Sequence, residues 1–276
     1  MNALEIRGLT KRRGDFALQG LDLTLPAGCI MGLIGENGAG KSTTIRLILN
    51  ALSRDGGTVA VYGKDNRALT PLEREDIGAV LDEVGLPEYM TAQQIGRMMA
   101  GIFTHWQPEA YRDYLRRLAL PEDKPFRDFS RGMKMKQGLA VALSHQPKLL
   151  LLDEATSGLD PVVRDEILTI FADFTRDEEH AVLISSHIVS DLEKICDYIA
   201  FLHKGRLLLC EEKDRLTEAY GILRGGAEDI DPAAVCGRHT TPYGTEYLVR
   251  RDAVPVGMAL GQVNIEDLFV FMAKEV

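Results

Sequence analysis

The chain has 276 residues, of which 45% are hydrophobic, so it can form one large domain or two small ones around a packed core. Its formal net charge of −9 makes no case for binding nucleic acid or anionic lipid, because such binding usually needs a basic surface. No stretch approaches the roughly 18 apolar residues that span a bilayer, and the first residues lack the apolar segment of a signal peptide. We therefore expect a cytoplasmic protein.

Two stretches near the start of the chain alternate apolar and polar residues. They cover residues 4–10 and 16–25, and a charged turn separates them. The alternation predicts an antiparallel pair of strands. Phe16 begins the second stretch, and its ring would either stack on a purine or belong to the core.

Residues 35–43 fit the pattern G-x-x-x-x-G-K-[ST], which is typical of loops that bind nucleotide phosphates. An apolar stretch at 29–34 predicts a buried strand before this loop, and 44–49 predict a helix after it. The glycines let successive N–H groups converge on an anion at the positive end of the helix dipole. Lys41 would reach the β- and γ-phosphates, and the hydroxyl of Ser42 would bind Mg²⁺. The predicted nucleotide-binding residues are Gly35, Glu36, Asn37, Gly38, Ala39, Gly40, Lys41, Ser42 and Thr43.

The middle of the chain changes from strands to helices. Apolar stretches at 58–62 and 77–81 predict strands, and the second one ends at Asp82. Residues 84–146 then show the helical spacing of apolar residues in several places. The predicted helices are 92–104, 109–118 and 131–144. We interpret this region as a helical insertion in an α/β core.

The core resumes at four leucines, residues 149–152, which predict a central strand of a parallel sheet. Asp153 and Glu154 follow directly, and ligands bind at the carboxyl ends of such strands. Both carboxylates should therefore lie beside the phosphate loop. The alternative is a buried strand that ends in two solvated charges, but a sharp polar loop at 157–161 before a predicted helix argues against it.

A further apolar strand is predicted at 181–185, and His187 follows it. Taken alone, this histidine is better explained as a partner of a helix cap than as a ligand.

Beyond residue 220 the pattern of apolar residues becomes weak. We expect residues 221–276 to form loops or a small α/β extension, closed by a helix at 264–274 with one apolar face. Residues 1–220 would then form the main domain.

In this order the motifs resemble those of the ATP-binding subunit of an ABC transporter, and the resemblance covers about residues 3–220. The matching segments are the Walker A loop at 35–43, Walker B with its adjacent glutamate at 149–154, the D-loop at 157–160 and the switch histidine, His187. The stretch Phe129-Ser130-Arg131-Gly132-Met133 is a variant of the family signature L-S-G-G-Q. This variant, together with Asp82 in the Q-loop and a single ATPase domain, resembles exporter-type (ABC-2) subunits.

The resemblance implies a P-loop NTPase (RecA-like) α/β core with an antiparallel β subdomain and a helical insertion. It also implies hydrolysis of ATP with Mg²⁺, in which Glu154 is the general base, Asp153 binds the metal and His187 contacts the γ-phosphate. It adds to the nucleotide-binding residues Ser130, Gly132 and Asp160. The serine and the helix N-terminus of the signature would cover ATP held by the opposite subunit.

The chain departs from the family pattern at several motif positions. Asp82 stands where a glutamine is usual; an aspartate can bind Mg²⁺ but donates no hydrogen bond when it is ionised. Arg131 and Met133 replace a glycine and a glutamine of the signature. Arg13 falls near the usual place of an adenine-stacking tyrosine, which makes Phe16 the candidate for stacking.

The resemblance further implies partners. Two ATPase subunits, identical or related, would form a dimer, and membrane-embedded permease subunits would hold it at the inner face of the cell membrane. No nucleic acid is expected. The alternatives are a soluble ABC-type ATPase that acts on nucleic acid or ribosomes, and a module that senses ATP without hydrolysing it; the presence of Glu154 argues against the second.

Overall fold

A sheet of six strands in the order β10-β9-β3-β8-β7-β6 forms the centre of the fold in the computed structural model, which describes residues 1–225, 230–242, 244–255 and 257–274. Its strands are β3 (Ile30–Ile34), β6 (Ile77–Val80), β7 (Leu149–Asp153), β8 (Ala181–Ser186), β9 (Tyr198–His203) and β10 (Arg206–Glu212). All neighbours are parallel except β10 and β9, which are antiparallel. Every residue of β3, β7 and β8 is buried, which agrees with the apolar stretches that predicted these three strands, and β7 lies inside the sheet as predicted.

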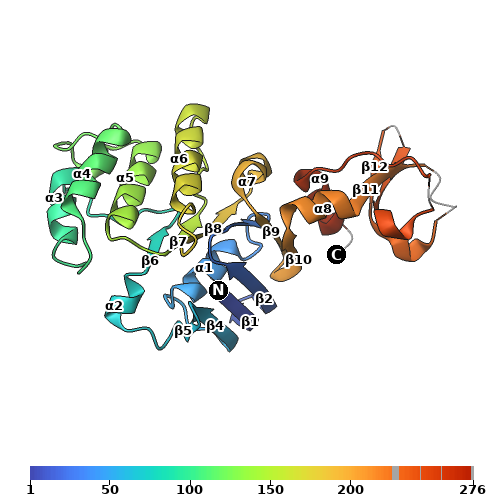
Figure 1. Ribbon diagram of the computed structural model, residues 1–276, viewed down its shortest axis with the longest axis horizontal. Coiled ribbons are helices and arrows are strands. Elements are labelled where there is room, and N and C mark those ends of the chain that lie inside the picture. Colours follow the sequence, from blue (N-terminus) through green and yellow to red (C-terminus); the bar gives the residue numbers. More distant parts are fainter. Residues whose placement is uncertain (226–229, 243, 256, 275–276) are drawn as a thin grey trace.

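Alternate residues of the central strands face two apolar cores. Leu150 and Leu152 of β7 belong to the core on one face, and Leu149 and Leu151 belong to the core on the other. Figure 1 shows α5 (Arg131–Ser144), α6 (Pro161–Phe174) and α7 (Val189–Ile195) over one face, and α1 (Lys41–Ile48) with a second sheet over the other. The sheet is therefore covered by other elements on both sides.

The second sheet is antiparallel, with the order β2-β1-β4-β5. Its strands are β1 (Asn2–Arg13), β2 (Phe16–Pro26), β4 (Gly56–Val61) and β5 (Lys64–Asp65). The predicted pairing of the first two strands is confirmed. β1 extends through Arg13, so the turn is shorter than expected and consists of Gly14 and Asp15.

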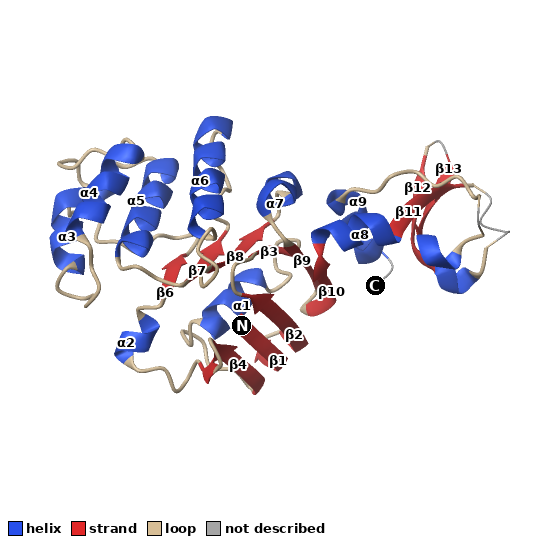
Figure 2. Ribbon diagram, viewed as in Figure 1, coloured by secondary structure: helices blue, strands red, loops and turns tan. Residues whose placement is uncertain are grey.

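The region between β6 and β7 is helical, as predicted (Figure 2). It contains α3 (Ala92–Met99), α4 (Pro108–Arg117), a 3-10 turn (Phe126–Asp128) and α5, and the short α2 (Pro71–Arg74) precedes β6. α3 begins at a capping box of Thr91 and Gln94. It ends at Met99, before the predicted end at 104, because Gly101 follows the C-cap residue and glycine disfavours helix.

The last part of the chain forms a third sheet, with the order β11-β13-β12, which extends away from the central sheet (Figure 1). Its elements are α8 (Lys213–Ala219), β11 (Tyr220–Arg224), a 3-10 turn (Pro232–Ala234), β12 (Val235–Thr241), β13 (Gly244–Arg250), a 3-10 turn (Arg251–Ala253) and α9 (Ile265–Lys274). Phe269 of α9 packs edge-on against Phe201 of β9, with ring centroids 5.3 Å apart. Glu193 of α7 accepts a hydrogen bond from the backbone N–H of Ile265 at 2.7 Å. The closing helix is thus attached to the central part of the molecule.

Within the described ranges, no helix combines the length and the apolar character needed to cross a membrane.

Replacing Leu151 with alanine should lower the free energy of unfolding by about 2–5 kcal/mol, because this fully buried side chain would leave a cavity. Urea denaturation followed by circular dichroism measures the loss. Leu72 is the control: it is 51% exposed, so alanine there should change the value by less than about 0.5 kcal/mol. Equal losses at both positions would contradict the central place of β7.

Candidate functional site

The loop between β3 and α1 borders a cavity of 370 Å³. Gly38 and Gly40 have φ values of 83° and 115°, which glycine adopts without strain. Gly40 is also the N-cap residue of α1, so the loop leads into the positive end of a helix. The residues that line the cavity are Arg13, Phe16, Glu36, Asn37, Gly38, Gly40, Lys41, Ser42, Thr43, Asp82 and Glu154. The fold thus gathers distant parts of the sequence around one loop.

Two predicted loop residues, Gly35 and Ala39, form the buried side of the loop and do not line this cavity. A Cβ atom added to Gly35 would lie 2.4 Å from the carbonyl oxygen of Leu202, so only glycine fits. The carbonyl oxygen of Gly35 accepts a hydrogen bond from Nζ of Lys41 at 2.7 Å. The backbone of the loop therefore helps to position the lysine.

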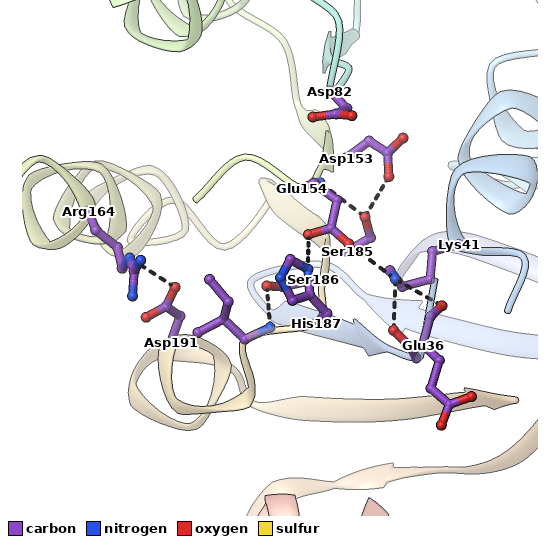
Figure 3. A network of polar contacts seen from close by, with 12 residues as sticks. Glu36, Lys41, Asp82, Asp153, Glu154, Arg164, Ser185, Ser186, His187 and Asp191 are labelled. Carbon is purple, nitrogen blue, oxygen red and sulfur yellow. Dashed lines mark hydrogen bonds and ion pairs between the residues drawn. The ribbon is translucent and has the colours of Figure 1, made fainter. Parts of the chain in front are cut away.

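Lys41, Glu154 and His187 form a continuous set of contacts beside the loop (Figure 3). Nζ of Lys41 lies 3.1 Å from Oε1 of Glu154, and Oε2 of Glu154 lies 2.7 Å from Nδ1 of His187. The side chains of Lys41 and Glu154 are only 5% and 13% exposed. A buried ammonium is stable only beside a negative charge. Glu154 supplies this charge here, and a nucleotide phosphate could supply it in the same way.

Ser185, at the end of β8, contacts both acidic residues that follow the leucine strand. Its hydroxyl donates a hydrogen bond to Oδ1 of Asp153 at 2.7 Å and accepts one from the backbone N–H of Glu154 at 3.2 Å. Glu154 has a φ of 53°, a conformation that is strained for residues other than glycine. We did not predict a site role for Ser185, although the polar end of its strand was the available signal.

Ser42, Asp82 and Asp153 offer the oxygen atoms that Mg²⁺ prefers as ligands. Among the residues that the structure describes, no group of three or more His, Cys, Asp or Glu side chains could hold a metal ion. Magnesium is usually held by one or two carboxylates together with the phosphates of a substrate. The donor set fits the ion, and the metal-binding roles stay predictions.

Phe16 packs against the loop and also lines the cavity. A Cβ atom added to Gly40 would lie 2.8 Å from Cζ of Phe16, and the ring is partly buried against one of the two cores. Core packing and exposure to the cavity are thus compatible. Stacking of this ring on adenine stays a prediction.

The carboxylate of Asp82 does not stand free in the cavity. Oδ1 of Asp82 lies 2.7 Å from Nη2 of Arg131, and both side chains are about half exposed. The predicted metal ligand is therefore held by an arginine of the signature.

The structure does not bring Ser130, Gly132 or Asp160 to the cavity of their own chain. Ser130 is the N-cap residue of α5, and its hydroxyl accepts a hydrogen bond from the N–H of Met133. Asp160 is the N-cap residue of α6. Both residues therefore cap a helix, and this structural role does not depend on contact with a nucleotide.

A phosphate loop at the carboxyl end of a parallel strand, opposite carboxylates from a nearby strand, defines a P-loop nucleoside triphosphatase. Residues 18–157 match the family model described as "ABC transporter". The chain belongs to this family, and its ATP-binding subunits hydrolyse ATP to drive transport. The fold class and the resemblance found in the sequence are thereby confirmed.

Similar proteins agree with this assignment. The bacitracin transport ATP-binding protein BcrA of Enterococcus faecalis is 27% identical over 95% of this chain and 87% of its own length. The lantibiotic transport ATP-binding protein SrtF of Streptococcus pyogenes is 32% identical over 76% of this chain and 91% of its own. A solved ATP-binding subunit of an ABC transporter has a TM-score of 0.72 and 26% identity, and the match covers 78% of this chain and 92% of that one.

Replacing Ser185 with alanine should lower the rate of ATP hydrolysis at saturating ATP and Mg²⁺ by about tenfold or more, because a hydrogen bond to a charged group is lost. Phosphate release measures the rate. Ser186 is the control, since it is also buried and its hydroxyl accepts a hydrogen bond from Ile188. A similar loss in Ser186→Ala would show that the effect does not arise from Asp153 and Glu154.

Proposed function

We propose that the chain hydrolyses Mg²⁺-ATP at an interface between two ATPase subunits and so powers an exporter through membrane-embedded partners. The observation that carries this proposal is the position of Glu154, 3.1 Å from the lysine of the phosphate loop. Export is supported by two relatives, which are named for the transport of bacitracin and of lantibiotics. The alternative of an ATPase acting on nucleic acid or ribosomes has no support from these relatives, and the net charge of −9 disfavours it.

Lys41 and the N–H groups of the loop would neutralise the phosphates, so positioning and electrostatics supply most of the catalysis. Mg²⁺, held by Ser42 and Asp153, would add positive charge at the phosphates when it is bound. Glu154 would accept a proton from the water that attacks the γ-phosphorus, while the bond from this phosphorus to the bridging β-phosphate oxygen breaks. His187 would orient Glu154 and contact the γ-phosphate.

The proposed dimer is supported by the positions of the signature residues. Ser130 and Gly132 lie at the start of α5, outside the cavity of their own chain. The first turn of α5 contains no acidic residue, and the N-terminus of a helix favours an anion. This helix end would bind the γ-phosphate of ATP on a second subunit, identical or related, and Asp160 of the D-loop would contribute to the same shared site.

We expect the contact with permease subunits to involve a second cavity, of 610 Å³. It lies between the loop that begins at Asp82 and the start of α5, and residues from both segments line it. Permease docking there would transmit closure of the dimer and hold the chain at the inner face of the cell membrane.

We also propose that residues 1–220 form the ATPase domain and residues 221–276 an extension. The last strand of the central sheet ends at Glu212, and β11, which starts at Tyr220, pairs in a different sheet.

Replacing Glu154 with glutamine should leave ATP binding intact and reduce turnover to background, because an amide cannot accept the proton of the attacking water. Calorimetry measures binding and phosphate release measures turnover. Glu179→Gln is the control, since this glutamate is 65% exposed and pairs with Lys148. Turnover of Glu154→Gln at the unaltered rate, with ATP bound, would show that another group is the base.

Mixing two inactive variants tests the shared site. Lys41→Ala disables the phosphate loop and Ser130→Ala disables the signature. When the two variants are mixed in equal amounts, each mixed dimer has one site in which both the loop and the signature are intact. We expect about a quarter of the unaltered activity if the subunits mix freely in a two-fold dimer. Activity that stays at the sum of the separate variants would contradict the shared site.

A further inference from the structure

Arg131 contacts two loops that border the nucleotide cavity. Its Nη2 atom lies 2.7 Å from Oδ1 of Asp82, in the loop after β6. Its guanidinium also packs on the D-loop, because a Cβ atom added to Gly158 would lie 3.4 Å from Nη1. Arg131 is itself the first residue of α5. One side chain therefore connects the start of this helix with the loops after β6 and β7.

The helix dipole of α5 favours the position of the Asp82 carboxylate beside Arg131. The start of a helix carries the positive end of the dipole, where a cation is unfavourable and an anion is favourable. The first turn of α5 contains Arg131 and no acidic residue. Asp82 supplies a negative charge to this helix end from a loop 49 positions away in the sequence.

The carboxylate of Asp82 also borders the nucleotide cavity, where it could bind a metal ion instead of Arg131. It lines the nucleotide cavity together with Lys41 and Ser42, and it lines the 610 Å³ cavity together with Arg131. A carboxylate oxygen that is bound to a guanidinium is less available to a metal ion. The two cavities thus meet at this one carboxylate.

We propose that Arg131 is a positioning residue that holds the carboxylate of Asp82 at the start of α5 and so competes with Mg²⁺ for it. The proposal rests on the proposed function in one respect, namely that Mg²⁺ enters the site with ATP. Both side chains are about half exposed, so the pair contributes little to the stability of the fold. Its consequence is the metal dependence of nucleotide binding.

A double-mutant cycle tests this competition by binding, without turnover. The dissociation constant of a non-hydrolysable imido analogue of ATP is measured by calorimetry, once with Mg²⁺ and once with EDTA. The chains are the unaltered protein, Arg131→Gln, Asp82→Asn and the double variant. Arg117→Gln is the control, because its ion pair with Asp173 also joins the helical insertion to the core at a half-exposed surface.

Arg131→Gln should tighten binding in Mg²⁺ by about two- to fivefold, the range of an exposed ion pair, and should not tighten it in EDTA. Asp82→Asn should weaken binding in Mg²⁺ only, and adding Arg131→Gln to it should change nothing further. General damage to the site cannot explain effects of opposite sign. Arg117→Gln should match the unaltered chain.

The role of Arg131 would be overturned if Arg131→Gln weakened binding in Mg²⁺ or left it unchanged. Equal tightening in EDTA, or in the presence of Asp82→Asn, would also overturn it. The proposed function is tested independently of this cycle. A chain that binds the analogue but hydrolyses no ATP would contradict the proposed function, while the binding cycle would still test the role of Arg131.

Discussion

The rest of the site depends on the buried charge of Lys41. Its side chain is 5% exposed, and its partners are the carbonyl oxygen of Gly35 and the carboxylate of Glu154. Removing one partner of a buried ion pair typically costs about 3–5 kcal/mol, so the lysine holds the glutamate firmly in the absence of another anion. In the proposed reaction, the γ-phosphate replaces the carboxylate as partner and frees Glu154 to face the attacking water. A single constraint then links nucleotide binding to the positioning of the base.

The parallel sheet is what brings these groups together. Asp153 of β7 lies opposite Ser185 of β8, and Ser186 of β8 lies opposite Ile34 of β3. The carboxyl ends of the three strands are therefore level, and the residues that follow them meet at one edge of the sheet. This alignment of the strand ends brings Lys41, Glu154 and His187 within contact distance of one another.

Much of this could be predicted from the sequence, since fully apolar strands and a nine-residue loop motif are strong local signals. The helix predicted at 131–144 has the bounds of α5. In contrast, no helix was predicted for α7, because seven residues are too few for a clear period and its stability comes from packing. The buried Val189 and Leu192 and the contacts with α6, α9 and β3 supply that packing. An ion pair also joins Arg164 of α6 to Asp191.

The site was predicted in the same unequal way. Motif residues such as Lys41 and Glu154 could be identified because Lys41 belongs to the loop motif and Glu154 directly follows an apolar strand. The pair of Asp82 and Arg131 did not, because no spacing encodes a side-chain contact between two loops 49 positions apart. From the sequence, both residues were recognised as departures from a family pattern and Asp82 was predicted to be a metal ligand, whereas the structure shows that the two residues contact each other.

The most direct test of the central claim is a crystal structure of the chain with Mg²⁺ and a non-hydrolysable ATP analogue. We predict that Nζ of Lys41 lies within hydrogen-bond distance of the β- and γ-phosphate oxygens, and that Glu154 has left the lysine to face the γ-phosphate through water. A bound analogue with the 3.1 Å contact between Lys41 and Glu154 still intact would contradict the account.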